Sequence, residues 1–288
     1  MTQATLKLIK TWQYLDKGFV ELLNVNMNEV DAALLARASF NKEEYDRVDD
    51  NLNLVDYLVR HHHTSPMEMP SFTVRLKIPI FVQRQNVRHR TARLNEQSLR
   101  YVTHDGDFHI PDVIRRKDKN VKQGSSSEAI EANDELKKLW EDHYKASYEL
   151  YEKSLAMGAA PEQARSLLGV GFYTTLVWQM DISNILKYMR LRSDPHAQLE
   201  IRLLSNIFEE IVKEYFPTIY SAWVNHQRDS LTLSSDEIDI LREVLSGNKT
   251  QNEAYLSRVE DRAKESLRST RVKELLGKME RIYRTDGI

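Results

Sequence analysis

A short segment of the chain concentrates side chains that are suited to binding phosphate. Between Arg84 and Arg100 the sequence places five arginines and one histidine against a single acid, Glu96, so the local charge is about +4. The planar guanidinium group can donate two parallel hydrogen bonds, which suits arginine to bidentate phosphate binding. Side chains able to contact a base or a sugar lie among them: Gln85, Asn95, Gln97, Ser98 and Tyr101. The segment indicates a local site for an anion, while charge alone would favour a solvated basic surface.

The composition of the whole chain restricts the classes of function. Its 288 residues carry 41 Lys and Arg against 43 Asp and Glu, a net charge of −2. A nucleic-acid-binding protein usually carries a clear basic excess, so no nucleic-acid partner is predicted. A non-catalytic RNA-binding protein that uses the 84–100 segment is the alternative from another class. The chain has no cysteine, which excludes disulfides, thiolate metal ligands and a thiolate nucleophile.

Two absences in the sequence predict a cytoplasmic protein. No run of about 18 apolar residues is present, so no membrane span is predicted. The first residues, MTQATLKLIKTWQYL, lack the apolar core and the small-residue cleavage site of a signal peptide.

Hydrophobic periodicity in the first half of the chain predicts helices around one clear strand. Apolar residues recur at helical spacing from Asp50 to Arg60, and they alternate from Ser71 to Lys77 as in a strand buried on one face. Ser65-Pro66-Met67-Glu68 has the residue types of a helix start with a capping box. Pro79 begins a short helix that leads into Arg88. The polar stretch 104–127 predicts an irregular surface excursion.

The second half is predicted to be mainly helical. A helix from Glu128 to Met157 carries an aromatic stripe that is expected to lie in the core, made of Trp140, Tyr144, Tyr148 and Tyr151. Further predicted elements are a helix from Pro161 to Leu168, a strand from Phe172 to Met180, a helix capped by Asp181 that runs to Leu191, and a helix capped by Asp194-Pro195 that runs to Pro217. Residues 1–225 are predicted to form the main domain, and residues 226–288, which are more charged, a C-terminal helical extension.

The arginine-rich segment resembles a known motif. Arg88-His89-Arg90, followed after seven residues by Ser98, is similar to the RHR-x7-S motif of flavin-dependent thymidylate synthases. Asn95-Glu96 and Arg100-Tyr101 stand where that family usually has them. Later blocks match in order and spacing: Gln163-Ala164-Arg165 and Leu191-Arg192-Ser193-Asp194-Pro195-His196-Ala197-Gln198. The similarity covers roughly Lys17 to Trp223.

The resemblance implies an activity and a fold. The family methylates C5 of dUMP to give dTMP, with 5,10-methylenetetrahydrofolate as carbon donor, FAD as cofactor and NADPH as reductant. A chain without cysteine could not use the alternative thymidylate synthase route, in which a cysteine attacks the base. The expected fold is mixed α/β, with a small, twisted, mostly antiparallel sheet flanked by long helices. The expected assembly is a homotetramer whose active sites are shared between subunits.

The resemblance also assigns roles to individual residues. Those implied to bind the nucleotide are Gln85, Glu96, Ser98, Leu99, Arg100, Arg165 and Arg192. Those implied to lie at FAD are His63, Ser65, Glu68, Arg88, His89, Arg90, Asp181, Lys187 and His196. Arg192 is expected at the pyrimidine ring, and Arg100 with Arg165 at the phosphate. Ser98 is expected to position substrate, since no His-Asp pattern supports its activation as a nucleophile.

Several of these residues have a structural interpretation beside the functional one. Ser65 and Glu68 fit a capping box equally well, and His196 alone would be a capping or core histidine. Three consecutive histidines, 61–63, cannot face one metal ion from a helix, and no metal site is predicted.

Three positions depart from the family pattern. Asp181 and Lys187 stand where asparagine is common, and Leu99 stands where glycine or a polar residue is common. The asparagine side chain can donate and accept hydrogen bonds, whereas the ionised side chain of Asp181 can only accept them. These departures favour, as a close alternative, the same site acting on UMP or giving a 5-hydroxymethyl product.

Overall fold

The computed structural model describes residues 7–38, 48–119, 124–230, 232–235, 238, 261, 264, 272, 273, 275, 276 and 278. It divides the chain into two compact units, Met1–Asp229 and Ser230–Ile288. The predicted C-terminal extension lies largely outside the described residues. Among the described residues, no helix is both long and apolar enough to cross a membrane.

The centre of the first unit is a five-stranded sheet whose pairings are all antiparallel. Its strands, in spatial order, are β1 (Lys10–Tyr14), β2 (Gly18–Val25), β3 (Ser71–Pro79), β7 (Tyr173–Asp181) and β4 (Arg93–Glu96). β3 and β7 pair over nine residues each, from Ser71 opposite Asp181 to Pro79 opposite Tyr173. The predicted mixed α/β fold with an antiparallel sheet is confirmed.

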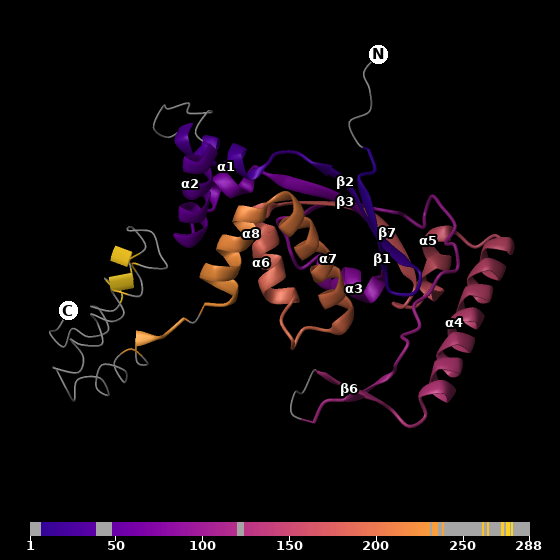
Figure 1. Ribbon diagram of the computed structural model, residues 1–288. Helices are drawn as coiled ribbons and strands as arrows, with labels where there is room; N and C mark the ends of the chain where they lie inside the picture. Colours follow the sequence, from indigo (N-terminus) through magenta and orange to yellow (C-terminus); the bar gives the residue numbers. More distant parts are fainter. Residues whose placement is uncertain are drawn as a thin grey trace, which may run out of the picture. The chain divides into compact units, whose positions relative to one another are not determined.

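Helices lie against one face of this sheet and at its two ends (Figure 1). They are α1 (Glu29–Arg37), α2 (Val48–Arg60), α3 (Ile80–Asn86), α4 (Asn133–Ala156), α5 (Pro161–Ala164), α6 (Ile182–Arg192), α7 (Leu199–Tyr215) and α8 (Pro217–Trp223). Figure 1 shows α6, α7 and α8 side by side, with α1 and α2 at one end of the unit and α4 and α5 at the other. Short 3-10 segments lie at Ser65–Glu68 and Arg165–Leu167, and a π-helical turn, Val224–Arg228, follows α8.

The core lies between the sheet and these helices. Val74 and Leu76 of β3 and Trp178 of β7 are fully buried, and the Trp178 ring stacks on Phe208 of α7 with centroids 5.1 Å apart. Arg75, on the opposite face of β3, is exposed and bonds Glu21 of β2. The predicted strand with one buried apolar face is therefore confirmed.

The segment between β4 and α4 is more ordered than predicted. A two-stranded hairpin, β5 (Arg115–Lys117) and β6 (Ser125–Ala129), projects from it. His104 and His109 are buried; the His104 ring bonds the carbonyl of Tyr173 at 2.8 Å. The prediction of an irregular surface excursion was wrong because these buried histidines find partners on distant elements.

Two predicted helix starts were also wrong. α7 begins at Leu199 with Gln198 at its N-cap position, while the Asp194 side chain caps a separate turn by accepting from the backbone N–H of His196. Ser65 does not cap a helix, because Thr64 takes the N-cap position of a four-residue 3-10 segment. The Thr64 hydroxyl donates to Glu68 at 3.0 Å, so no capping box forms there.

The aromatic stripe on α4 is only partly buried. Tyr151 is fully buried, Tyr144 and Tyr148 are half-buried beside Phe172, and Trp140 is exposed. The prediction of a core position is wrong for Trp140.

Candidate functional site

The arginine-rich segment forms a turn between a helix and the edge of the sheet. α3 ends at Asn86, the turn carries Arg88, His89 and Arg90, and β4 then pairs with β7. The turn is tied to α3 by backbone bonds from Arg88 to Gln85 and from His89 to Asn86. The motif is thus held at both ends by regular structure.

One group of predicted residues converges behind this turn. Arg192, the last residue of α6, donates from Nε to Nε2 of His89 at 3.0 Å and from Nη2 to the carbonyl of Gln85 at 3.1 Å. The Gln85 side chain in turn donates to Gln198 at the start of α7 at 2.6 Å. Segments that are about a hundred residues apart in sequence therefore meet at one point. Gln198 was not predicted as a site residue, although it ends the matching block.

Burial and the neighbouring Arg192 together determine the protonation state of His89. Burial, followed by the positive charge of Arg192, lowers the pKa of His89 from its ordinary value of 6.5 to about 4. The imidazole is therefore neutral near pH 7, and Nε2 is the acceptor that the Arg192 N–H requires. The ring also packs on Tyr188 of α6, with centroids 4.3 Å apart.

A second group of predicted residues lies beside α5. The Arg100 guanidinium is 3.9 Å from the Glu162 carboxylate, and Arg165 donates to the Glu162 carbonyl at 3.4 Å. Both arginines are exposed. No described contact links this pair of arginines to the pair formed by His89 and Arg192, so within one chain the predicted nucleotide ligands form two separate groups.

Glu96 and Ser98 occupy the end of β4 and the turn that follows it. The Glu96 carboxylate accepts from the Thr174 hydroxyl at 2.7 Å and from Gln83 at 3.3 Å. Ser98 Oγ accepts from the backbone N–H of Arg100 at 3.4 Å. Leu99, next to Ser98, is half-buried. The hydroxyl of Ser98 has no histidine beside it among the described contacts, which agrees with positioning rather than nucleophilic attack.

Six of the residues expected at the flavin lie in three places. His63 and Lys187 line a small cavity of about 60 Å³ together with Thr64 and Ser183. Ser65 and Glu68 lie exposed on the neighbouring 3-10 segment. Arg88 and Arg90 are exposed in the motif turn.

Two of the expected flavin residues have local structural partners. Asp181 is buried and caps α6, accepting from the backbone N–H of Asn184 at 3.0 Å and from the Asn184 side chain. His196 pairs with Asp194 at 2.9 Å and lines a different, larger cavity at the start of α7. Both residues thus have structural roles that require no ligand.

The donor set of the motif turn suits an anionic ligand. Within the described part of the chain, no carboxylate forms an ion pair with the guanidinium groups of Arg84, Arg88, Arg90 or Arg93, which are all exposed. Uncompensated guanidinium groups can bind the oxygens of a pyrophosphate in a bidentate manner. The residues present therefore fit the pyrophosphate of a dinucleotide cofactor.

The fold and this cluster of cations define a mixed α/β protein with a group of exposed arginines at one edge of an antiparallel sheet. The family model described as "Thymidylate synthase complementing protein" matches residues 21–218. A flavin-dependent thymidylate synthase of Wolbachia pipientis wMel is 35% identical over 259 residues, which cover 88% of this chain and 90% of the relative.

Two further comparisons agree. A flavin-dependent thymidylate synthase of Thermus thermophilus is 39% identical over 234 residues, which cover 81% of this chain and 85% of the relative. A solved structure of the UMP/dUMP methylase PolB from Streptomyces cacaoi, bound with 5-Br dUMP, aligns with a TM-score of 0.68 at 27% identity and covers 75% of this chain and 99% of that one. The chain belongs to the flavin-dependent thymidylate synthase family, and it is an enzyme.

Proposed function

We propose that the protein methylates C5 of dUMP, with FAD bound at the motif turn, 5,10-methylenetetrahydrofolate as carbon donor and NADPH as reductant. The observation that carries the proposal is the contact between His89 and Arg192, because it joins the RHR turn to the later matching block in one polar cluster. Membership of the family and the names of the relatives support the flavin and the nucleotide.

Arg192 is the residue that would act on the reacting ring. A fixed guanidinium lowers the free energy of negative charge that develops on the pyrimidine as C5 becomes nucleophilic. His89 and the Gln85 carbonyl hold this guanidinium in place before substrate arrives, so little reorganisation is needed. Bound flavin would supply the hydride chemistry. Arg88, His89 and Arg90, with His63, Ser65, Glu68 and Lys187, would hold it, whereas His196 lines a different cavity.

The remaining residues would position the nucleotide. Arg100 and Arg165 provide two exposed cations for its phosphate, while Glu96 and Ser98 provide an acceptor and a hydroxyl for base or sugar. Because these arginines and Arg192 form separate groups in one chain, we propose that a neighbouring subunit of a homotetramer completes each site.

The nucleotide preference has a second candidate. PolB has been solved with 5-Br UMP as well as with 5-Br dUMP, at TM-scores of 0.66 and 0.68 to this chain. UMP is therefore a candidate substrate here. Turnover of UMP and dUMP by the same preparation distinguishes the two, because the 2′-hydroxyl needs space and a hydrogen-bond partner.

The proposal is tested on the purified full chain. We expect visible flavin absorption and formation of dTMP from dUMP, methylenetetrahydrofolate and NADPH. A colourless protein that takes up no FAD and makes no dTMP would overturn the proposal.

A further inference from the structure

Two neighbouring cavities lie at the start of α7. The first has a volume of about 300 Å³ and the second of about 490 Å³. Arg115 and Leu199 line both of them. Because they share these two side chains, the cavities are adjacent and could hold two parts of one ligand.

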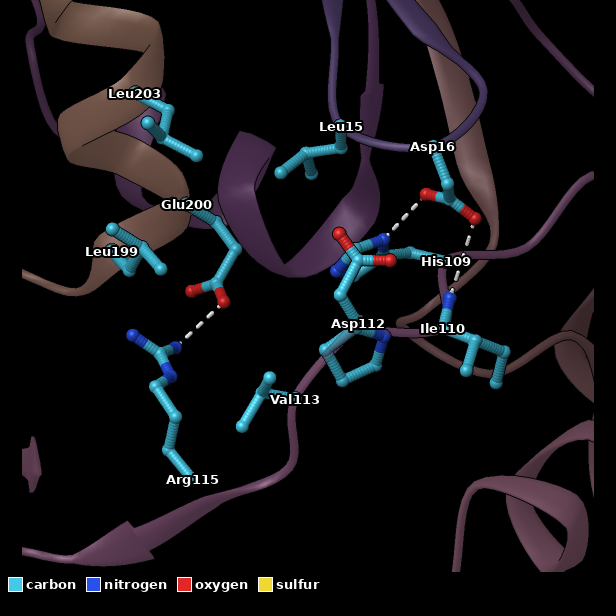
Figure 2. A pocket seen from close by; sticks show the side chains of 11 residues that line it. Leu15, Asp16, His109, Ile110, Asp112, Val113, Arg115, Leu199, Glu200 and Leu203 are labelled. Atoms are coloured by element: carbon cyan, nitrogen blue, oxygen red, sulfur yellow. Dashed lines mark hydrogen bonds and ion pairs between the residues drawn. The ribbon is translucent and has the colours of Figure 1, made fainter. Parts of the chain in front are cut away.

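The first cavity is mainly apolar, and three carboxylates line it: Asp16, the exposed Asp112 and the buried Glu200. Leu15, Val113 and Leu203 line it, as Figure 2 shows. Glu200 is 6% exposed; one of its oxygens accepts from Arg115 at 2.7 Å, and the other, Oε2, is buried without a partner among the described residues. An unsatisfied buried acceptor is unfavourable. A flat, apolar group that carries an N–H donor would satisfy it.

Asp16 lies in the opposite wall of the first cavity, and its carboxylate, unlike that of Glu200, already has hydrogen-bond partners. His109 donates to its carboxylate at 2.6 Å and Tyr173 at 2.5 Å (Figure 2 shows the first of these). Burial alone would raise the pKa of Asp16, but the hydrogen bonds from His109 and Tyr173 lower it to about 2, so the carboxylate is ionised near pH 7. Asp16 therefore links His109 and Tyr173 in this wall and is not available to a ligand.

The second cavity is polar and suits a phosphate. Arg202 and Arg115 provide guanidinium groups, and Ser125 of the hairpin provides a hydroxyl; among the described lining residues Asp118 is the only carboxylate. Nε of Arg202 is buried without a partner among the described residues, while its Nη1 donates to the carbonyl of Pro195 at 3.3 Å. A phosphate oxygen would satisfy this nitrogen.

The start of α7 adds to this preference. α7 has 17 residues, and Gln198 at its N-cap makes no side-chain cap because it bonds Gln85 instead. The backbone N–H groups of the first turn are thus left to an anion. Gln198 lines this cavity and also contacts the His89–Arg192 cluster through Gln85, so a ligand here would lie next to the proposed active site.

We propose that the two cavities together bind a nucleotide with an amino-substituted base, the base in the first cavity against Glu200 and the phosphate in the second against Arg202. The adenine half of a dinucleotide has this chemistry. Its identification with the proposed reductant, NADPH, rests on the proposed function.

The site itself is tested by calorimetric titration of AMP into the FAD-loaded, dUMP-saturated full chain. We expect AMP to bind and Arg202→Gln to weaken binding roughly tenfold or more, since a charge-assisted bond is lost. Val113→Phe, which fills the first cavity, should weaken AMP binding too. The matched control is Arg116→Gln, a neighbouring arginine that lines neither cavity, and it should bind AMP like the unaltered chain.

Titrations with IMP and NADP⁺ test which group of the ligand is recognised. IMP presents a carbonyl in place of the amine and should bind more weakly than AMP, because it would face the Glu200 carboxylate. NADP⁺ should displace AMP. The site is overturned if AMP does not bind, or if Arg202→Gln binds AMP as tightly as the unaltered chain does. The base contact is overturned if IMP binds as tightly as AMP. The identification with the reductant is overturned if NADP⁺ does not displace AMP. An enzyme that makes dTMP but does not bind AMP would refute this inference alone.

Discussion

At the scale of residues, the cluster of His89 and Arg192 combines a neutral base with a fixed cation. The His89 ring accepts from Arg192 only while Nε2 is unprotonated. Tyr188, whose ring packs on His89, is fully buried. A substitution at His89 or Tyr188 should therefore alter where the Arg192 guanidinium is held.

Arg192→Lys tests whether the guanidinium geometry matters. Lysine keeps the charge but cannot donate to both His89 and the Gln85 carbonyl from one planar group. We expect kcat/KM for dUMP to fall by roughly a hundredfold, the size found when one preorganised donor is removed, while FAD is still bound. Arg190→Lys, on the same helix and exposed, serves as the control and should leave kcat/KM unchanged. Equal loss in both variants would contradict the assigned role.

The lowered pKa of His89 predicts a pH dependence of stability. The unfolded chain takes up a proton at this residue near pH 6.5 and the folded chain only near pH 4. The free energy of unfolding should thus decrease as the pH falls from about 6.5 to about 4, and this residue should contribute no further change below that range. Urea unfolding across these pH values measures it. In His89→Gln, which keeps an acceptor but does not titrate, the slope should be shallower; an unchanged slope would contradict the prediction.

The site residues were predictable to different degrees. The RHR turn, Arg165 and Arg192 could be proposed from the sequence, because the proposal needs only the order of the motifs and the residue types. The bond between Gln85 and Gln198 could not, because it depends on how α3 and α7 pack. The partners of Glu96 were missed for a similar reason, since Thr174 meets it only through the pairing of β4 with β7.

At the scale of elements, α6 carries Arg192 at its end and depends on Asp181 at its start. The Asp181 carboxylate accepts from the first-turn backbone N–H of Asn184 at 3.0 Å. This cap explains an aspartate at a position where the family commonly has asparagine, because both residues are good N-caps.

Asp181→Ala and Asp181→Asn separate the cap from a flavin contact. Alanine removes the cap and should lower the free energy of unfolding by about 1 kcal/mol, whereas asparagine should retain it. Chemical denaturation measures the stability, and FAD titration the affinity. If Asp181→Asn is as stable as the unaltered chain but has altered FAD affinity, the flavin contact is supported. Unaltered affinity in this variant would leave the cap as its only role.

The elements that were predicted well are those with strong local patterns. α2, β3 and β7 have clear periodicity, and their residues are buried accordingly. β4 was missed because its sequence, RLNE, is polar and all four residues are exposed. Only its pairing with β7, far along the chain, makes it a strand. The start of α7 was misplaced because Asp194-Pro195 has the residue types of a helix cap but caps an isolated turn.

At the scale of the whole molecule, the separation of the two arginine groups predicts sharing of the active site between subunits. We expect the full chain to sediment at about four times the 33.7 kDa of one chain. Analytical ultracentrifugation measures this mass. A monomer that retains full activity would contradict the proposed homotetramer.

Subunit sharing is tested separately by mixing two inactive variants. If Arg165 and Arg192 act in one site from different chains, then mixed oligomers of Arg165→Gln and Arg192→Gln contain some sites with both arginines intact. Co-refolding the two variants should restore dTMP formation, whereas each variant refolded alone should remain inactive. No recovery in oligomers shown by mass to be mixed would place both residues in the same chain's site.

β4 has a consequence for the solubility of the protein. It is a short outer strand of the sheet, and its side chains are exposed. Exposed outer strands can pair with strands of other molecules, and charged side chains on such strands oppose this. Arg93 and Glu96 are charged side chains of this kind, so we expect them to oppose intermolecular β-pairing and aggregation.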